Sequence, residues 1–167
     1  MSSAVEKTGD QIEVDESQEV RCLLIPQRNS TLMLPNTVVA EVTDYSPPET
    51  TEHSPDWLLG LLSWRGRNIP LISFENFFGG ADIKEPRQVA VLNSLNGNGE
   101  LPFMAITISD LPRLAQVNRS SVEYIEGDDA DEGEAGPVLA RMNLSGEFVI
   151  IPNVDFLEDR VAQLGIQ

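Results

Sequence analysis

The chain contains one histidine and one cysteine, the side chains that most often supply a general base or a nucleophile. His53 lies in a polar stretch between Glu52 and Ser54, and it is predicted to be a solvated loop residue. Cys22 lies inside the apolar run that begins at Val20, which predicts a buried structural thiol. Their spacing leaves a pairing open, but neither has the surroundings that activate a catalytic group. The sequence therefore predicts no catalytic residue.

The acidic stretch at residues 126–136 is the nearest approach to a metal site, because it places several carboxylates close together. It lacks the spacing of a calcium loop with its central glycine, so a mobile acidic loop is the favoured interpretation and a cation site the alternative. Neither common phosphate-binding glycine pattern is present, and Gly79-Gly80 and Asn96–Gly99 are interpreted as turns. We expect no metal, no cofactor and no enzymatic activity.

The net charge of −16 argues against nucleic acid as a partner, because phosphate backbones must be neutralised by lysine and arginine. Much of the negative charge is confined to residues 1–17, with five acids, and residues 126–134, with six. The first segment is predicted to be a disordered acidic tail. High solubility is the simplest explanation of both segments.

Apolar segments of the chain are short. None approaches the length of about 18 residues needed to span a bilayer, and residues 1–15 lack the apolar core of a signal peptide. We therefore expect a cytoplasmic protein with no direct membrane insertion.

The element that would position functional side chains is most clearly marked at residues 58–72. Apolar strands at 58–64 and 69–72 flank a polar turn, Arg65-Gly66-Arg67-Asn68, and predict a β-hairpin. Glycine supplies the positive φ that short hairpin turns need. Trp64 and Arg65 stand at the tip, and a solvated arginine beside a large aromatic is typical of a protein interface. The alternative for Arg65 is a structural brace that pairs with a nearby carboxylate.

The remaining elements are short and mostly extended. Further strands are expected at 20–25, 31–34, 88–92, 101–108, 121–125, 138–144 and 148–151. Residues 35–42 could form a strand or a helical turn, and the β-branched run favours the strand; Pro112 leaves 108–117 ambiguous. Single helical turns are expected at 55–60 and 73–79, and Asn153 is expected to cap an amphipathic helix over 153–164. Roughly ten strands with frequent turns predict an all-β barrel or sandwich.

A weak internal repeat appears when Gly66 is aligned with Gly146. Each copy reads as an apolar strand, a turn glycine, an apolar strand and a short helix opened by a small polar residue. The apolar runs Cys22–Ile25 and Val89–Leu92 precede their respective copies in the same order. The repeat predicts two similar halves of about 65 to 80 residues.

At the hairpin over residues 58–72 the sequence resembles the chemotaxis coupling-protein (CheW-like) family. The resemblance rests on Pro55-Asp-Trp57-Leu-Leu-Gly60-Leu-Leu-Ser-Trp-Arg65-Gly66-Arg-Asn-Ile-Pro70-Leu-Ile, and upstream on Leu34-Pro35-Asn-Thr-Val38-Val39-Ala-Glu41-Val42. It extends over about residues 19–162 and implies a CheW-like domain at 18–164, after the tail. The implied fold is all-β, with two SH3-like five-stranded barrels packed together, short helices and a C-terminal helix.

The same resemblance implies a non-enzymatic adaptor. Its partners would be the cytoplasmic tip of methyl-accepting chemoreceptors and a CheA-type histidine kinase. The kinase's regulatory domain, which shares this fold in the family, would pack against an exposed barrel end of the first half. The hairpin and the resemblance together predict these protein-binding residues: Arg65, Trp64, Gly66, Val38, Val42, Glu41 and Pro70.

The chain departs from the family pattern at a few positions. Ser63-Trp64 replaces a common Asn-Leu pair, Ser73 replaces an aspartate, and the second copy of the repeat lacks Arg-Gly. These differences are typical of a divergent member, and a pathway controlling type IV pili is one alternative to a flagellar one. The competing interpretation is a generic SH3-like peptide-binding or regulatory module.

Overall fold

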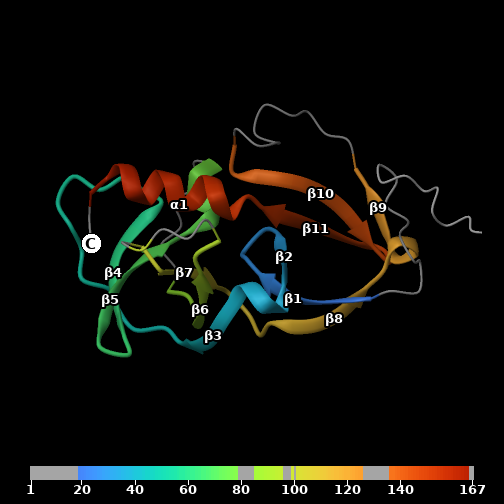
Figure 1. The fold of residues 1–167 in the computed structure, drawn as a ribbon, viewed down its shortest axis with the longest axis horizontal. Coiled ribbons are helices and arrows are strands. Elements are labelled where there is room, and N and C mark those ends of the chain that lie inside the picture. The colour runs from blue at the N-terminus through green and yellow to red at the C-terminus, as the bar shows by residue number, and fades with distance from the viewer. Residues whose placement is uncertain (1–18, 79–84, 96–98, 100, 126–135, 166–167) are drawn as a thin grey trace, which may run out of the picture.

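Strands dominate the computed structural model, which describes residues 19–78, 85–95, 99, 101–125 and 136–165. The predicted tail at 1–17 and nearly all of the predicted acidic loop lie outside the described residues, as does most of the turn at 96–99. The described strands form two curled sheets, which lie side by side along the long axis of the molecule (Figure 1). The predicted all-β class is therefore confirmed.

Each sheet makes one SH3-like barrel. Barrel 1 has the strand order β3-β6-β7-β5-β4, made of Val39–Asp44, Gln88–Asn93, Phe103–Ile108, Arg67–Ile72 and Leu58–Trp64. Barrel 2 has the order β8-β1-β2-β11-β10-β9, made of Arg113–Val117, Val20–Pro26, Thr31–Pro35, Glu147–Pro152, Val138–Leu144 and Val122–Tyr124. Barrel 2 thus has one strand more than the predicted five.

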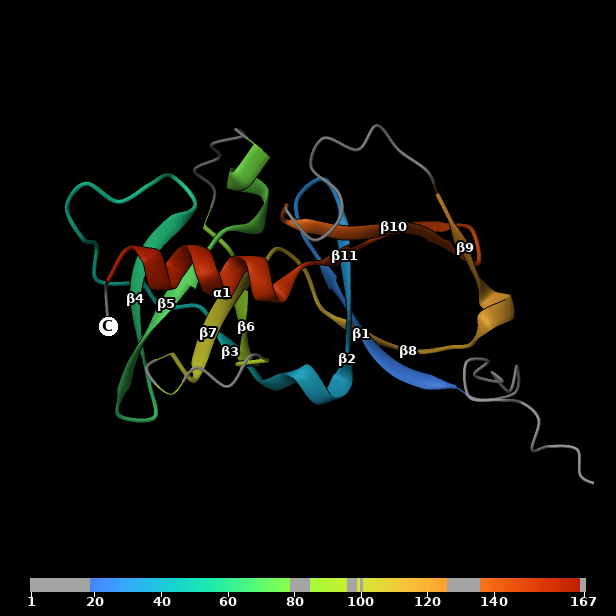
Figure 2. The same ribbon diagram turned by 45° about the horizontal axis from the view of Figure 1, so that its top comes forward.

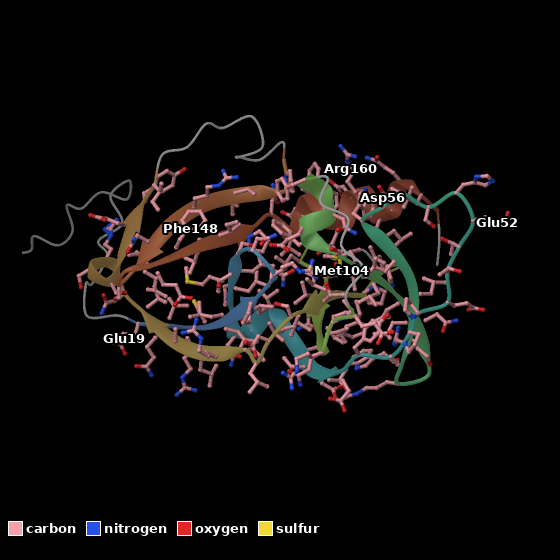
Figure 3. All side chains as sticks on the ribbon, turned by 180° about the vertical axis from the view of Figure 1, so that it is seen from behind. Glu19, Glu52, Asp56, Met104, Phe148 and Arg160 are labelled. Atoms are coloured by element: carbon pink, nitrogen blue, oxygen red, sulfur yellow. The ribbon has the colours of Figure 1, made fainter. Side chains whose placement is uncertain are left out.

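Strand alternation explains why these apolar runs are continuous. On β1, Leu23 and Ile25 face a central core between the barrels, whereas Cys22 and Leu24 face the interior of barrel 2. The same alternation on β6 gives barrel 1 its own interior, made of Leu62, Trp64, Ile69, Leu71, Val89, Val91 and Ala105. Both faces of these strands are buried, so apolar side chains at consecutive positions are stabilising. Figure 3 shows Met104, only 2% exposed, at the centre of the molecule.

The two barrels share one pattern of strand pairing, and the repeated hairpins β4–β5 and β10–β11 occupy the same place in it. In each, a hairpin joins a second hairpin through a parallel pair, β5 with β7 in barrel 1 and β11 with β2 in barrel 2. The partner hairpins are exchanged, however: β1 and β2 from the start of the chain pair with the late hairpin β10–β11. Each barrel therefore contains strands from both halves of the sequence, and the consecutive halves are not the structural units.

Of two local predictions, one is met only in part and the other was wrong. Residues Asn36–Val38 form a 3-10 turn, η2, before β3 begins at Val39, so the strand predicted for 35–42 is only partly present. The helical turn predicted at 55–60 is a tight turn, in which Leu58 N donates to Pro55 O, and β4 follows at once. In the second case, pairing of β4 with β5 satisfies more backbone groups than one helical turn could.

The other short elements follow the sequence closely. The predicted helix at 73–79 is the 3-10 segment η3, Phe74–Phe78, and a 3-10 turn η4, Arg119–Ser121, precedes β9. The C-terminal helix α1, Val154–Gln163, is capped as predicted, because Phe156 N donates to Asn153 Oδ1. Its apolar face, Val154, Leu157 and Val161, completes the central core.

Helix α1 follows directly from barrel 2 but extends across barrel 1, and this placement is the same in both ribbon views (Figures 1 and 2). The β4–β5 turn lies on the side of barrel 1 that faces away from α1. Among the described residues, no helix has the length and apolar character to cross a membrane.

Candidate protein-binding site

The β4–β5 turn is tighter than predicted, because only Arg65 and Gly66 separate the strands. Both have positive φ, 49° and 76°, as a type I′ hairpin turn requires. For a residue with a side chain this conformation costs about 1–2 kcal/mol. The turn therefore holds the arginine at the tip of the β4–β5 hairpin, between two paired strands.

Trp64 closes the end of the barrel 1 interior. The residue is 8% exposed, and its ring meets the ring of Phe103 at a centroid distance of 4.8 Å. The indole Nε1 donates to Glu41 Oε1 over 3.0 Å, so the polar atom of this buried ring has an acceptor. The Trp64 ring is therefore packed in the interior of barrel 1.

Arg65 is both a brace and an exposed group. Its Nη2 lies 3.0 Å from Glu41 Oε1, the same oxygen that accepts from Trp64, and its guanidinium carbon lies 5.0 Å from the Trp64 ring centre. The Arg65 side chain is 68% exposed. One carboxylate and one ring therefore fix the guanidinium, while most of its donors face solvent.

A second arginine lies on the same surface. Arg67 is the cross-strand partner of Trp64, and its guanidinium carbon lies 5.3 Å from the centre of the Phe103 ring. Arg65, Trp64, Phe103 and Arg67 thus form a continuous set of contacts, which we call the arginine–aromatic stack.

The residues predicted to bind a partner separate into two groups. Glu41, Trp64, Arg65 and Gly66 come together at the turn, although Glu41 belongs to a different strand. Val38 and Pro70 are buried, Val38 in the central core and Pro70 on β5 opposite Leu61. Val42 is half-buried and packs on the central core. The structure thus brings four of the seven residues together, and for all seven a role in binding stays a prediction.

Sequence reasoning missed Arg67 and Phe103 as members of the site. A two-residue turn makes Trp64 and Arg67 direct neighbours across the hairpin, so a tighter turn assignment would have found Arg67. Phe103 could not be found in this way, because it reaches the turn only through the parallel pairing of β5 with β7.

The groups first considered for catalysis do not converge. His53 is exposed in the loop between β3 and β4, whereas Cys22 is buried on β1. Burial raises the pKa of the Cys22 thiol above its usual value, which keeps it protonated and unreactive. Across the described residues, no group of three or more His, Cys, Asp or Glu side chains could hold a metal ion.

A cavity of about 620 Å³ lies between the β1–β2 turn, the start of η3 and the end of β7. Its lining carries both signs of charge, including Arg28, Glu75, Arg87 and Asp110. Glu75 is occupied within the fold, because Oε2 accepts from Asn29 N and Ser30 Oγ. No His or Cys is found among the described residues that line the cavity, so it offers no base or nucleophile of those types.

Comparison with known proteins agrees with this architecture. The CheW-like domain family matches residues 21–161, which is most of the chain. The chain belongs to the CheW-like family. A comparison with curated protein sequences gives no match.

Among solved structures, the fold of this CheW-like chain is similar to that of the scaffolding protein TtCheW from Thermoanaerobacter tengcongensis. The TM-score is 0.64 at 16% sequence identity, and the match covers 85% of this chain and 89% of that protein. At this identity the likeness establishes the fold, and the residues of the candidate site have to be judged on their own geometry.

Proposed function

We propose that this CheW-like chain is a non-enzymatic adaptor that couples methyl-accepting chemoreceptors to a CheA-type histidine kinase. Its CheW-like membership supports the proposal, as does the likeness to a protein described as a scaffold. The observation that carries it is the turn at Arg65 and Gly66, where Glu41 and Trp64 hold an exposed arginine in a fixed position. The partners would be the cytoplasmic tip of the receptor and the kinase, in a chemotaxis or type IV pilus pathway.

The geometry suits binding because the arginine is ordered before a partner arrives. Ordering a long side chain at an interface costs about 0.5–1.5 kcal/mol. The Glu41 ion pair and the Trp64 ring already restrict Arg65 in the free protein. Part of the ordering cost is therefore met during folding and does not reduce the free energy of binding. Arginine and tryptophan are enriched among the few residues that dominate binding energy in protein interfaces.

Coupling requires that two partners bind at once. We expect the full chain to form a ternary complex with a receptor tip fragment and the kinase, eluting as one species in size-exclusion chromatography. It should also make kinase activity respond to the receptor. A generic SH3-like peptide-binding module would bind one of the two and fail to bridge them.

The Arg65→Ala variant tests the site itself. It should weaken receptor binding while the fold and kinase binding are retained. Arg113→Ala is the matched control, because it also removes an exposed arginine from an ion pair, with Glu147 on barrel 2. Full receptor coupling by correctly folded Arg65→Ala would reject the assigned role of this residue, and absence of any ternary complex would reject the adaptor function.

A further inference from the structure

The arginine–aromatic stack carries more positive charge than its own carboxylate can neutralise. Glu41 lies within ion-pair distance of Arg65. Within the part of the chain that the structure describes, Arg67 has no carboxylate at that distance, and its contact is with the face of Phe103. The exposed hairpin end therefore presents two guanidinium groups, each in contact with an aromatic ring. Arg65 is paired with a carboxylate, and Arg67 has none within ion-pair distance among the described residues.

Stacking leaves the guanidinium edges available for hydrogen bonds. A guanidinium carries five N–H donors in its own plane, and contact with a ring uses its face rather than those donors. Arg67 is held from one side by Phe103, just as Trp64 holds Arg65. Two planar groups of this kind, fixed on one hairpin, suit carboxylates, which accept two parallel N–H bonds.

We infer that Arg67 is a second specificity-determining residue of the site, and that Arg65 and Arg67 together receive carboxylates on an acidic helical face of the receptor tip. This inference rests on the proposed adaptor function and adds the chemistry of the partner surface. The net charge of the whole chain indicates which kind of anionic partner the two arginines can bind. A net charge of −16 repels extended polyanions such as nucleic acid or an anionic membrane, whereas two local arginines can still bind discrete carboxylates at short range.

The test uses the full chain and an immobilised fragment of a chemoreceptor's cytoplasmic tip from the same organism. Arg67→Glu should weaken binding by about tenfold or more, and Arg67→Gln by less, because opposed like charges add repulsion to the lost contact. Arg67→Lys should be intermediate, since it keeps the charge and loses the planar fork. Arg119→Glu, an exposed arginine on η4 of barrel 2, makes the same change in net charge and should leave binding unchanged.

Two further readouts identify the partner group. Binding by the native chain should weaken between low and high salt more steeply than binding by Arg67→Gln. Replacing one receptor acid by lysine should restore affinity to Arg67→Glu and reduce it for the native chain. Urea unfolding of each variant, together with kinase binding, confirms that the fold is retained.

The outcomes separate the two proposals. If Arg67→Glu binds the receptor fragment as tightly as the native chain does, or more tightly, the inference is overturned and the adaptor function is unaffected. Loss of kinase binding in place of receptor binding would also overturn it, because the acidic surface would then belong to the kinase. Failure of the native chain to bind the receptor at any salt concentration would reject the adaptor function and the inference with it.

Discussion

Arg113 on β8 occupies the position in barrel 2 that Glu41 occupies on β3 of barrel 1. Glu41 pairs with Val91 and Arg113 pairs with Leu24, at the edge strand of each barrel. Glu41 forms an ion pair with Arg65 at the first hairpin, whereas Arg113 Nη2 lies 2.7 Å from Glu147 Oε2 beside the second turn. The charges of the second ion pair are thus reversed, and its acid, Glu147, corresponds in its hairpin to Arg67 rather than to Arg65. An ion pair between the edge strand and the hairpin is therefore present in both barrels, whereas its polarity differs.

Because one oxygen of Glu41 accepts from both Trp64 and Arg65, removing Glu41 should cost more stability than removing Arg65. Arg65→Ala should lower the free energy of unfolding by less than about 1 kcal/mol, because the ion pair is exposed and Trp64 keeps its acceptor. Glu41→Ala should cost about 1–3 kcal/mol, since it leaves the buried indole N–H unpaired. Urea unfolding measures both. Glu41→Gln, which retains an acceptor oxygen, is the control and should resemble Arg65→Ala; equal losses for Arg65→Ala and Glu41→Ala would contradict this account.

Among the described glycines with positive φ, Gly60 is predicted to tolerate substitution least. Its φ is +143°, and an added Cβ would overlap the Glu49 carbonyl oxygen and lie 2.9 Å from the carbonyl carbon. Glu49 cannot easily withdraw, because it exchanges two backbone hydrogen bonds of 2.8 Å with Leu61. Gly60→Ala should therefore cost at least about 2 kcal/mol.

Gly146→Ala separates backbone strain from overlap in that experiment. Gly146 also has a positive φ, +94°, but an added Cβ would meet nothing within 4 Å. The control should cost about 1 kcal/mol by urea unfolding. A loss for Gly60→Ala no larger than that of Gly146→Ala would show that the Glu49 contact is unimportant.

Local signals in the sequence were sufficient for much of the fold. The hairpin around Gly66, the strand at 20–25 and the helix capped by Asn153 depend on residues close together in the chain, and each is present. Their causes are turn conformation, alternation and capping, all of which act over a few residues. The family motif placed Glu41 and Arg65 in one site because it contained both segments.

Long-range pairing could not be derived in this way. The exchange that brings β1 and β2 beside β11 depends on which sheet faces bury the most apolar surface, and both arrangements preserve the same local pattern. The contact between Trp64 and Phe103 follows from the corresponding parallel pairing of β5 with β7 in barrel 1, and it was missed for the same reason. At 36–38 the strand was favoured over the helical turn because β-branched residues favour a strand locally, whereas Val38 is buried in the central core from a 3-10 turn.

Burial of Cys22 predicts slow thiol chemistry and a characteristic pH dependence. The residue is 5% exposed and desolvation raises its pKa above 9.0, so the thiol should react with an aromatic disulfide reagent at least about 100-fold more slowly than in the urea-unfolded chain. The folded protein binds the Cys22 proton more tightly than the unfolded chain does. The contribution of the protonated thiol to the free energy of unfolding is therefore complete below pH 9.0 and is lost as the pH rises above it. Unfolding of native protein and Cys22→Ala across that range measures the effect. A fall in stability of the same size in both would assign it to other groups.

Glu158 is predicted to be the most important carboxylate for the stability of the described chain. The residue is only 1% exposed, and its two oxygens accept from Ser94 Oγ at 2.8 Å and Leu95 N at 2.7 Å, which joins α1 to the end of β6. Glu158→Ala removes both acceptors inside the protein, and the loss should be about 2–3 kcal/mol in urea unfolding. Glu158→Gln keeps one acceptor and should lose less.

The neighbouring Asp159 supplies the matched control, since it is an exposed acid on the same helix turn. Asp159→Ala makes the same change in net charge and should alter stability by less than about 0.5 kcal/mol. If the two alanine variants unfold at the same urea concentration, the buried hydrogen bonds contribute nothing beyond the change in net charge. A larger loss for Glu158→Ala with an unchanged m-value would instead locate the effect in the native contact between α1 and the segment after β6, because the surface exposed on unfolding would be the same.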